Sequence, residues 1–121
     1  MAVAATRTLD AWGSLDILVN GVAGNSVCVA EALSPNGFGT VVDIHLKGTF
    51  NMSRAPFSYL KRRGGVILNI SATVHHLGTS GQVHAAAAKA GVDAVTRNTR
   101  GRMGPVRHIS RARLTTRPAW L

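Results

Sequence analysis

Two short apolar runs constrain the fold of this chain more than any other feature. They are Leu15-Asp16-Ile17-Leu18-Val19 and Val66-Ile67-Leu68-Asn69-Ile70, and a glycine lies shortly before each. Runs of this length and composition are typical of strands that are buried on both faces, as in a parallel sheet. Two parallel strands joined through a helix form a right-handed crossover unit. The pattern therefore predicts an α/β fold, a doubly wound parallel sheet with two central strands and flanking helices.

Three segments are predicted to be helical: residues 2–12, 35–63 and 82–98. The second begins after Ser34-Pro35, which supplies a serine N-cap followed by proline at the first helical position. Pro56 is expected to kink this long helix, because proline lacks a backbone N–H and clashes with the preceding turn.

The predicted sheet is too small to be self-contained. Two parallel strands leave two open edges and uncovered faces. A dinucleotide-binding fold opens on a strand and a Gly-rich phosphate turn, and no such motif precedes the first run in these 121 residues. We therefore expect residues 1–98 to be part of a domain, truncated at both ends, that lacks its N-terminal Gly-rich strand–helix–strand unit.

The basic charge is concentrated near the C-terminus. The formal net charge is +9, yet residues 1–96 carry seven basic and five acidic side chains. Residues 97–121 carry seven arginines and no acid. Residues 99–121 are therefore interpreted as a basic, disordered tail. Such a tail binds nucleic acid only non-specifically, through salt-dependent counterion release.

Several classes of protein are excluded or disfavoured by simple features. There is no run of 18 apolar residues, which excludes a membrane span. Cys28 is the single cysteine, so no internal disulfide can form, and packing is its expected role. The histidines at 75, 76 and 84 lack the spacing of a structural zinc site and have no cysteine partner, so no metal site is predicted.

Three motifs resemble the short-chain dehydrogenase/reductase family. Residues 13–20, Gly-Ser-Leu-Asp-Ile-Leu-Val-Asn, are similar to its fourth strand and to the start of its Asn-Asn-Ala-Gly turn. Residues 65–71, Gly-Val-Ile-Leu-Asn-Ile-Ser, resemble its fifth strand. Residues 85–91 resemble the helix that carries its Tyr-x-x-x-Lys pair. The resemblance implies a partial Rossmann-like domain.

The greatest similarity is to the peroxisomal type of 2,4-dienoyl-CoA reductase. Residues 20–25, Asn-Gly-Val-Ala-Gly-Asn, resemble its Asn-x-Ala-Ala-Gly-Asn turn, and segments 32–38, 48–52, 69–73 and 82–94 match it as well. The usual tyrosine position is Ala85 and the usual serine position is Ala72. The peroxisomal dienoyl-CoA reductases also lack both of these side chains.

The resemblance implies NADPH-dependent reduction of a 2,4-dienoyl-CoA to a 3-enoyl-CoA in the β-oxidation of unsaturated fatty acids. The implied cofactor-binding residues are Asn20, Gly21, Gly24, Ser71 and Lys89, with Lys89 on the nicotinamide ribose. The implied substrate-binding residues are Ser26, Ser34, Pro35 and Asn36. Simpler roles stay open: Lys89 as a solvated lysine, the glycines as turn residues, and Ser34 as an N-cap.

The implied catalytic residues are His45 and Lys89. In the relatives an aspartate on the long helix, acting with a water, supplies the proton, and His45 occupies that position here. A histidine can donate a proton near neutral pH, although it does not reproduce a carboxylate. Because the Gly-rich phosphate turn is missing, we expect these residues alone to bind NADPH weakly and to be inactive as a separate fragment.

The tail departs from the family. Relatives continue after residue 98 as Leu-Ala-Val-Glu-Trp-Gly-Pro-Tyr-Gly-Ile. One permitted encoding of residues 99–108, read one nucleotide further on, spells that segment up to the start of its isoleucine. Met103-Gly104 forces tryptophan in this second frame whatever codons are used. Our hypothesis is that the tail is family sequence read out of frame, which the nucleotide sequence would decide.

The resemblance also implies an acyl-CoA substrate, a homo-oligomer formed through the long helices, and a peroxisomal location. The last three residues, Ala-Trp-Leu, are not a Ser-Lys-Leu peroxisomal signal, and no secretory signal is evident at the N-terminus, so the other expected location is cytoplasmic. Two other functions stay open: a catalytically silent fold remnant or interaction fragment, and a basic nucleic-acid-binding arm.

Overall fold

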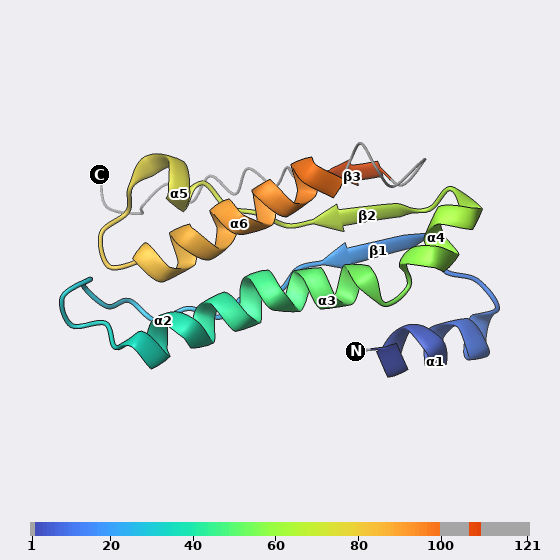
Figure 1. Ribbon diagram of the computed structural model, residues 1–121, viewed down its shortest axis with the longest axis horizontal. Coiled ribbons are helices and arrows are strands. Elements are labelled where there is room, and N and C mark those ends of the chain that lie inside the picture. Colours follow the sequence, from blue (N-terminus) through green and yellow to red (C-terminus); the bar gives the residue numbers. More distant parts are fainter. Residues whose placement is uncertain (1, 100–106, 110–121) are drawn as a thin grey trace, which may run out of the picture.

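The computed structural model describes residues 2–99 and 107–109 (Figure 1). The elements follow in the order α1 (Ala2–Trp12), β1 (Ile17–Asn20), α2 (Pro35–Val42), η1 (Asp43–Lys47), α3 (Gly48–Arg54), α4 (Phe57–Arg63), β2 (Val66–Asn69), α5 (Val74–Leu77), α6 (Val83–Thr99) and β3 (Arg107–Ile109). The alternation of strands and helices confirms the predicted α/β class.

The sheet is parallel and has the order β1-β2-β3. Residues 17–20 pair in register with residues 66–69, which confirms both predicted strands and the helical crossover between them. We predicted only two strands and no regular structure after residue 98. Strand β3 shows that this prediction is wrong for residues 107–109. This pairing requires no particular side chains, because the hydrogen bonds between strands are made by the backbone and β2 has an edge that β1 does not occupy. Residues 100–106 and 110–121 lie outside the described residues.

The helices that pack on the sheet lie on one of its faces. In Figure 1, α3 lies next to β1 and α6 next to β2. In β2 the side chain of Ile67 is fully buried, whereas in β1 Ile17 and Val19 are 61% and 56% exposed. The prediction that both strands are buried on both faces is therefore wrong for β1. Strand residues alternate between faces, so the alternate β1 residues point to the face that no described helix covers.

The long helix predicted between the strands is present, but in four parts. The side chain of Ser34 accepts a hydrogen bond from the Gly37 backbone N–H (3.0 Å), which confirms the predicted N-cap. Residues 43–47 form a π-helical segment, which adds a residue to the turn. The helix breaks at Pro56, as expected, and α4 ends at Gly64, whose φ of 68° favours glycine.

Helix α1 lies near α4 and apart from the sheet (Figure 1). Its last residue, Trp12, is 80% exposed, and the Tyr59 hydroxyl donates to the Gly13 carbonyl at 3.3 Å. Among the described helices none combines the length and apolarity needed to cross a membrane.

The apolar core is small and lies between α4 and β2. Leu60 and Ile67 are fully buried, and the partly buried Leu15, Leu18 and Phe57 pack against them. A second interface joins α6 to α2 and η1, where Ala85, Ala88, Val92 and Val41 are buried. Together these contacts hold the strands against the helices.

Replacing Gly65 by alanine is expected to lower the free energy of unfolding by about 1–3 kcal/mol. A Cβ atom on Gly65 would lie 2.6 Å from Leu60 Cδ2 and 3.0 Å from the Asp16 carbonyl oxygen, so the core would have to shift. Gly39→Ala is the matched control. Nothing lies within 4 Å of its added Cβ, and alanine favours the helix by roughly 1 kcal/mol. Urea denaturation followed by circular dichroism should shift in opposite directions for the two variants; a stabilised Gly65→Ala would contradict the packing.

Candidate functional site

Strands β1 and β2 both end in asparagine, and these two residues are register partners. The Asn20 side-chain amide donates to Asn69 Oδ1 (2.8 Å) and to the Ser53 hydroxyl (2.9 Å). Asn69 Nδ2 donates to the Thr96 hydroxyl at 3.0 Å. Asn20, Asn69 and Thr96 are buried and Ser53 is half-buried, and the network ties β1, β2, α3 and α6 together. Asn20, which we assigned to cofactor binding, thus uses its side-chain amide inside the protein.

Lys89 lies against the segments that leave these two strands. Its Nζ donates to the carbonyl oxygens of Ile70 (2.8 Å) and Val22 (3.2 Å), and the residue is only 8% exposed. Burial lowers the pKa of the Lys89 ammonium group, and the negative charge of Asp93 partly opposes this. Lys89 is therefore buried, and two of its three ammonium N–H groups donate to carbonyl oxygens of described residues. The alternative that Lys89 is a solvated helix lysine is wrong.

His45 lies in the π-helical segment η1 and is buried. Its Nε2 lies 2.9 Å from the Gly24 backbone nitrogen and 2.7 Å from the Gly24 carbonyl oxygen, and these two contacts require opposite tautomers. In either tautomer Nδ1 has no partner among the described residues. The additional residue in a π-helical turn changes which side chains face inward, and such turns are frequent at functional sites.

The other residues of the assigned cofactor group lie around Lys89 and His45. Gly24 contacts His45 through its backbone, and an added Cβ would meet Ile44 at 3.6 Å. Gly21 is exposed, and only Ile70 lies within 4 Å of its added Cβ. The Ser71 hydroxyl is buried and has no partner among the described residues. The Ser71 hydroxyl and the third Lys89 N–H group therefore have hydrogen-bonding capacity that the described residues do not use.

The assigned substrate group is less well organised. Ser26, Ser34, Pro35 and Asn36 are all exposed. Ser34 caps α2, and the Asn36 carbonyl accepts from the Thr40 hydroxyl within the same helix. Among the described residues, no hydrogen bond joins these four side chains to Lys89 or His45, so their assignment to substrate binding stays a prediction.

Two features of the site were missed by sequence reasoning. One is the Asn20–Asn69–Thr96 network, for which the matching ends of the strands, Ile-Leu-Val-Asn and Val-Ile-Leu-Asn, were the available signal. The other is His84, which is fully buried, has no hydrogen-bond partner for either ring nitrogen among the described residues, and interacts electrostatically with His45. No local pattern indicated that His84 faces inward.

The protein is expected to lose stability as the pH falls below 6.5 because of His45. Burial lowers the pKa of this imidazole from its ordinary value of 6.5. The hydrogen bond with Gly24 raises the pKa in part, and electrostatic interactions with Lys89 and His84 lower it further. Between the folded-state pKa and 6.5 the unfolded chain binds more protons, so the free energy of unfolding decreases with falling pH. Melting curves from pH 8 to pH 5 should show a smaller decrease for His45→Gln than for the unchanged protein. Equal slopes would contradict this role of His45.

Comparison with known proteins places this arrangement in a family. The profile described as short chain dehydrogenase matches residues 1–110. The peroxisomal 2,4-dienoyl-CoA reductase of Arabidopsis thaliana is 53% identical over 100 residues, covering 75% of this chain and 34% of that protein. The enzyme of the same description from Saccharomyces cerevisiae is 45% identical over 103 residues, covering 85% and 35%.

A solved structure agrees with the sequence matches. A short chain dehydrogenase from Bacillus anthracis superposes with a TM-score of 0.79 at 40% identity, covering 87% of this chain and 46% of that one. This chain spans about a third of the length of the curated relatives it matches. The profile, the identities and the superposition agree: the chain belongs to the short-chain dehydrogenase family.

Proposed function

We propose that this chain forms the nicotinamide-facing part of an NADPH-dependent reductase of 2,4-dienoyl-CoA esters. The proposal depends on the buried Lys89. Its ammonium group binds the segments that follow β1 and β2 and keeps one N–H group without an acceptor among the described residues. The dienoyl-CoA substrate is suggested by the relatives at 45–53% identity. A peroxisomal location and assembly through the long helices belong to the same proposal.

The residues fit the nicotinamide ribose. Ser71 offers a buried hydroxyl without a partner among the described residues, and an added Cβ on Gly21 would make only an ordinary contact with Ile70 at 3.9 Å. Lys89 is a compact donor suited to ribose hydroxyls. NADPH, when bound, supplies the hydride. The chain's own residues orient the ribose and exclude water around it.

Proton delivery is the step of the proposed reaction that these residues assist least. General-acid assistance typically contributes about 10²–10⁴-fold to a rate. Burial keeps the pKa of His45 below its ordinary value, so the ring is mainly neutral at pH 7 and is a poor acid there. We therefore propose that reduction by this chain alone is slow or undetectable. The same observation favours the second candidate, a catalytically silent remnant that keeps the family fold.

Saturation-transfer NMR with NADPH tests the proposal on the 121-residue chain. We expect weak binding, with stronger transfer to protons of the nicotinamide and its ribose than to those of the adenine, because the fitting residues are those around Lys89. Oxidation of NADPH should then depend on added 2,4-dienoyl-CoA and not on a saturated acyl-CoA. Binding without turnover would favour the silent remnant. Equal or stronger transfer to the adenine, or none, would contradict the proposal.

A further inference from the structure

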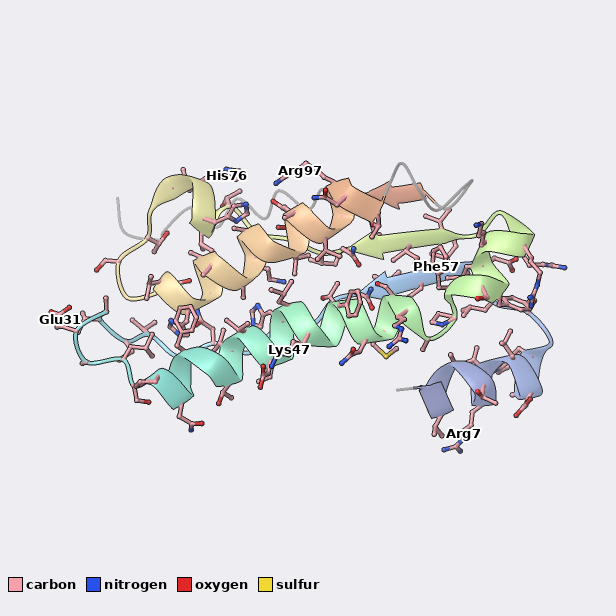
Figure 2. The ribbon with its side chains drawn as sticks, viewed as in Figure 1. Arg7, Glu31, Lys47, Phe57, His76 and Arg97 are labelled. Carbon is pink, nitrogen blue, oxygen red and sulfur yellow. The ribbon has the colours of Figure 1, made fainter. Side chains whose placement is uncertain are left out.

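Helices α5 and α6 bring two histidines and an aspartate together beside the candidate site. His75 Nε2 lies 2.8 Å from Asp93 Oδ2. One ligand atom from each of His75, His76 and Asp93 can be chosen so that all lie within 4.8 Å of one another. Figure 2 shows His76 on α5, next to α6. The three side chains therefore form a compact set of nitrogen and oxygen donors.

The cluster contains buried polar atoms that the described residues leave without a partner. The side chains of His75 and Asp93 are 8% and 11% exposed. His75 Nδ1 and Asp93 Oδ1 have no hydrogen-bond partner among the described residues. A buried polar atom without a hydrogen-bond partner is costly in free energy. Because His75 and Asp93 each have one such atom, this cluster is suited to binding a further group. His76, by contrast, is exposed and free to adjust.

The local fold explains why these residues meet. Helix α5 is a single turn that ends at Gly78, with φ of 68°, and its consecutive histidine rings lie with centroids 4.0 Å apart at 43°. Asp93 comes from the middle of α6, eighteen residues after His75. We predicted no metal site because the histidines lack the spacing of a structural zinc site and have no cysteine partner. The packing of α5 on α6 supplies the third ligand.

We propose that His75, His76 and Asp93 bind a zinc ion. Zinc prefers imidazole nitrogen and carboxylate oxygen at about 2.0–2.2 Å, commonly with three protein ligands and one water in a tetrahedron. Such bond lengths separate neighbouring ligand atoms by about 3.4 Å. The ligand atoms lie within 4.8 Å of one another, so side-chain rotation has to bring them closer together for all three to bind the ion. On binding, one nitrogen of each histidine and one oxygen of Asp93 bond to the metal, and any proton on those atoms is released to solvent.

A zinc ion there would fasten α5 to α6. Helix α5 begins three residues after Ser71, and Asp93 is one helical turn from Lys89. The ion would thus brace the wall of the candidate site without taking part in the proposed reduction. Hydrogen exchange of the backbone amides in α5 should slow when zinc binds.

Isothermal titration with zinc chloride at pH 7.5, on the EDTA-treated 121-residue chain, tests the site. One zinc ion per chain is expected, with no heat from magnesium. His76→Gln and Asp93→Asn should each weaken binding at least tenfold. His76 is exposed, so its variant should keep the fold, which circular dichroism checks.

Two control variants separate this site from other zinc ligands in the chain. Asp10→Asn removes an exposed carboxylate in α1, and Cys28→Ser removes the single thiol; both should bind zinc as the unchanged protein does. No binding by the folded protein would overturn the proposal. So would unchanged affinity in both His76→Gln and Asp93→Asn, or loss of binding in Cys28→Ser.

Discussion

Replacing Leu60 by alanine is expected to lower the free energy of unfolding by about 2–5 kcal/mol. Leu60 is fully buried in α4 and packs with Ile67 of β2, and only three partly buried side chains complete this cluster. Removing its methyl groups leaves a cavity that so few neighbours cannot fill. Small domains are stable by roughly 5–15 kcal/mol, so a loss of this size removes much of the total.

Thermal and urea denaturation of the Leu60→Ala variant, followed by circular dichroism, measure this loss. Leu77→Ala is the matched control, because Leu77 is the same residue type in a helix but is 76% exposed. The control should change the free energy of unfolding by less than about 0.5 kcal/mol. A cost below 1 kcal/mol for Leu60→Ala would show that the contact between α4 and β2 does not hold the fold together.

The strands and helices were predictable because their signals are local. Apolar runs bounded by turn residues define β1 and β2, and serine and proline define the start of α2. The exposed face of β1 was not predictable in the same way. An apolar run does not say whether a layer of helices covers each face, so Ile17 and Val19 were expected to be buried and are not.

The site was predictable where backbone geometry sets it. Strands that run in parallel end at the same edge, so residues after β1 and β2 meet. Lys89, which the family resemblance assigned to the cofactor, reaches both of these segments. Side-chain partners were not predictable. The bond from Asn20 to Asn69 and the contact of His45 with Gly24 depend on register and on the π-helical segment, which no short motif encodes.

The strand within residues 107–109 shows another limit of sequence reasoning. Its parallel pairing with β2 uses backbone hydrogen bonds, which almost any residue can make. We predicted that the arginine-rich tail is disordered from its charge alone. The free edge of β2 instead allows residues 107–109 to form a strand.

Replacing Lys89 by methionine is expected to weaken NADPH binding by about 10- to 150-fold. On the proposed function, Lys89 gives the ribose one charge-assisted hydrogen bond, and such bonds contribute about 1.5–3 kcal/mol. Each 1.4 kcal/mol corresponds to about tenfold in affinity. The two carbonyl oxygens of Val22 and Ile70 also lose their donor, so the turn that surrounds the ribose loses its support. Saturation transfer to the nicotinamide ribose protons should fall to the background level.

Two further variants separate the role of Lys89 from that of positive charge alone. Lys47→Met removes an exposed lysine that pairs with Asp43 on η1, and NADPH binding should be unchanged. Lys89→Arg keeps the charge, but a planar guanidinium does not reproduce a compact ammonium donor between two carbonyls, so binding should still weaken. If Lys89→Arg binds like the unchanged protein, attraction to phosphate explains the affinity. If Lys89→Met also binds normally while its melting curve is unchanged, Lys89 does not contact the cofactor, and the central contact of the proposed function is lost.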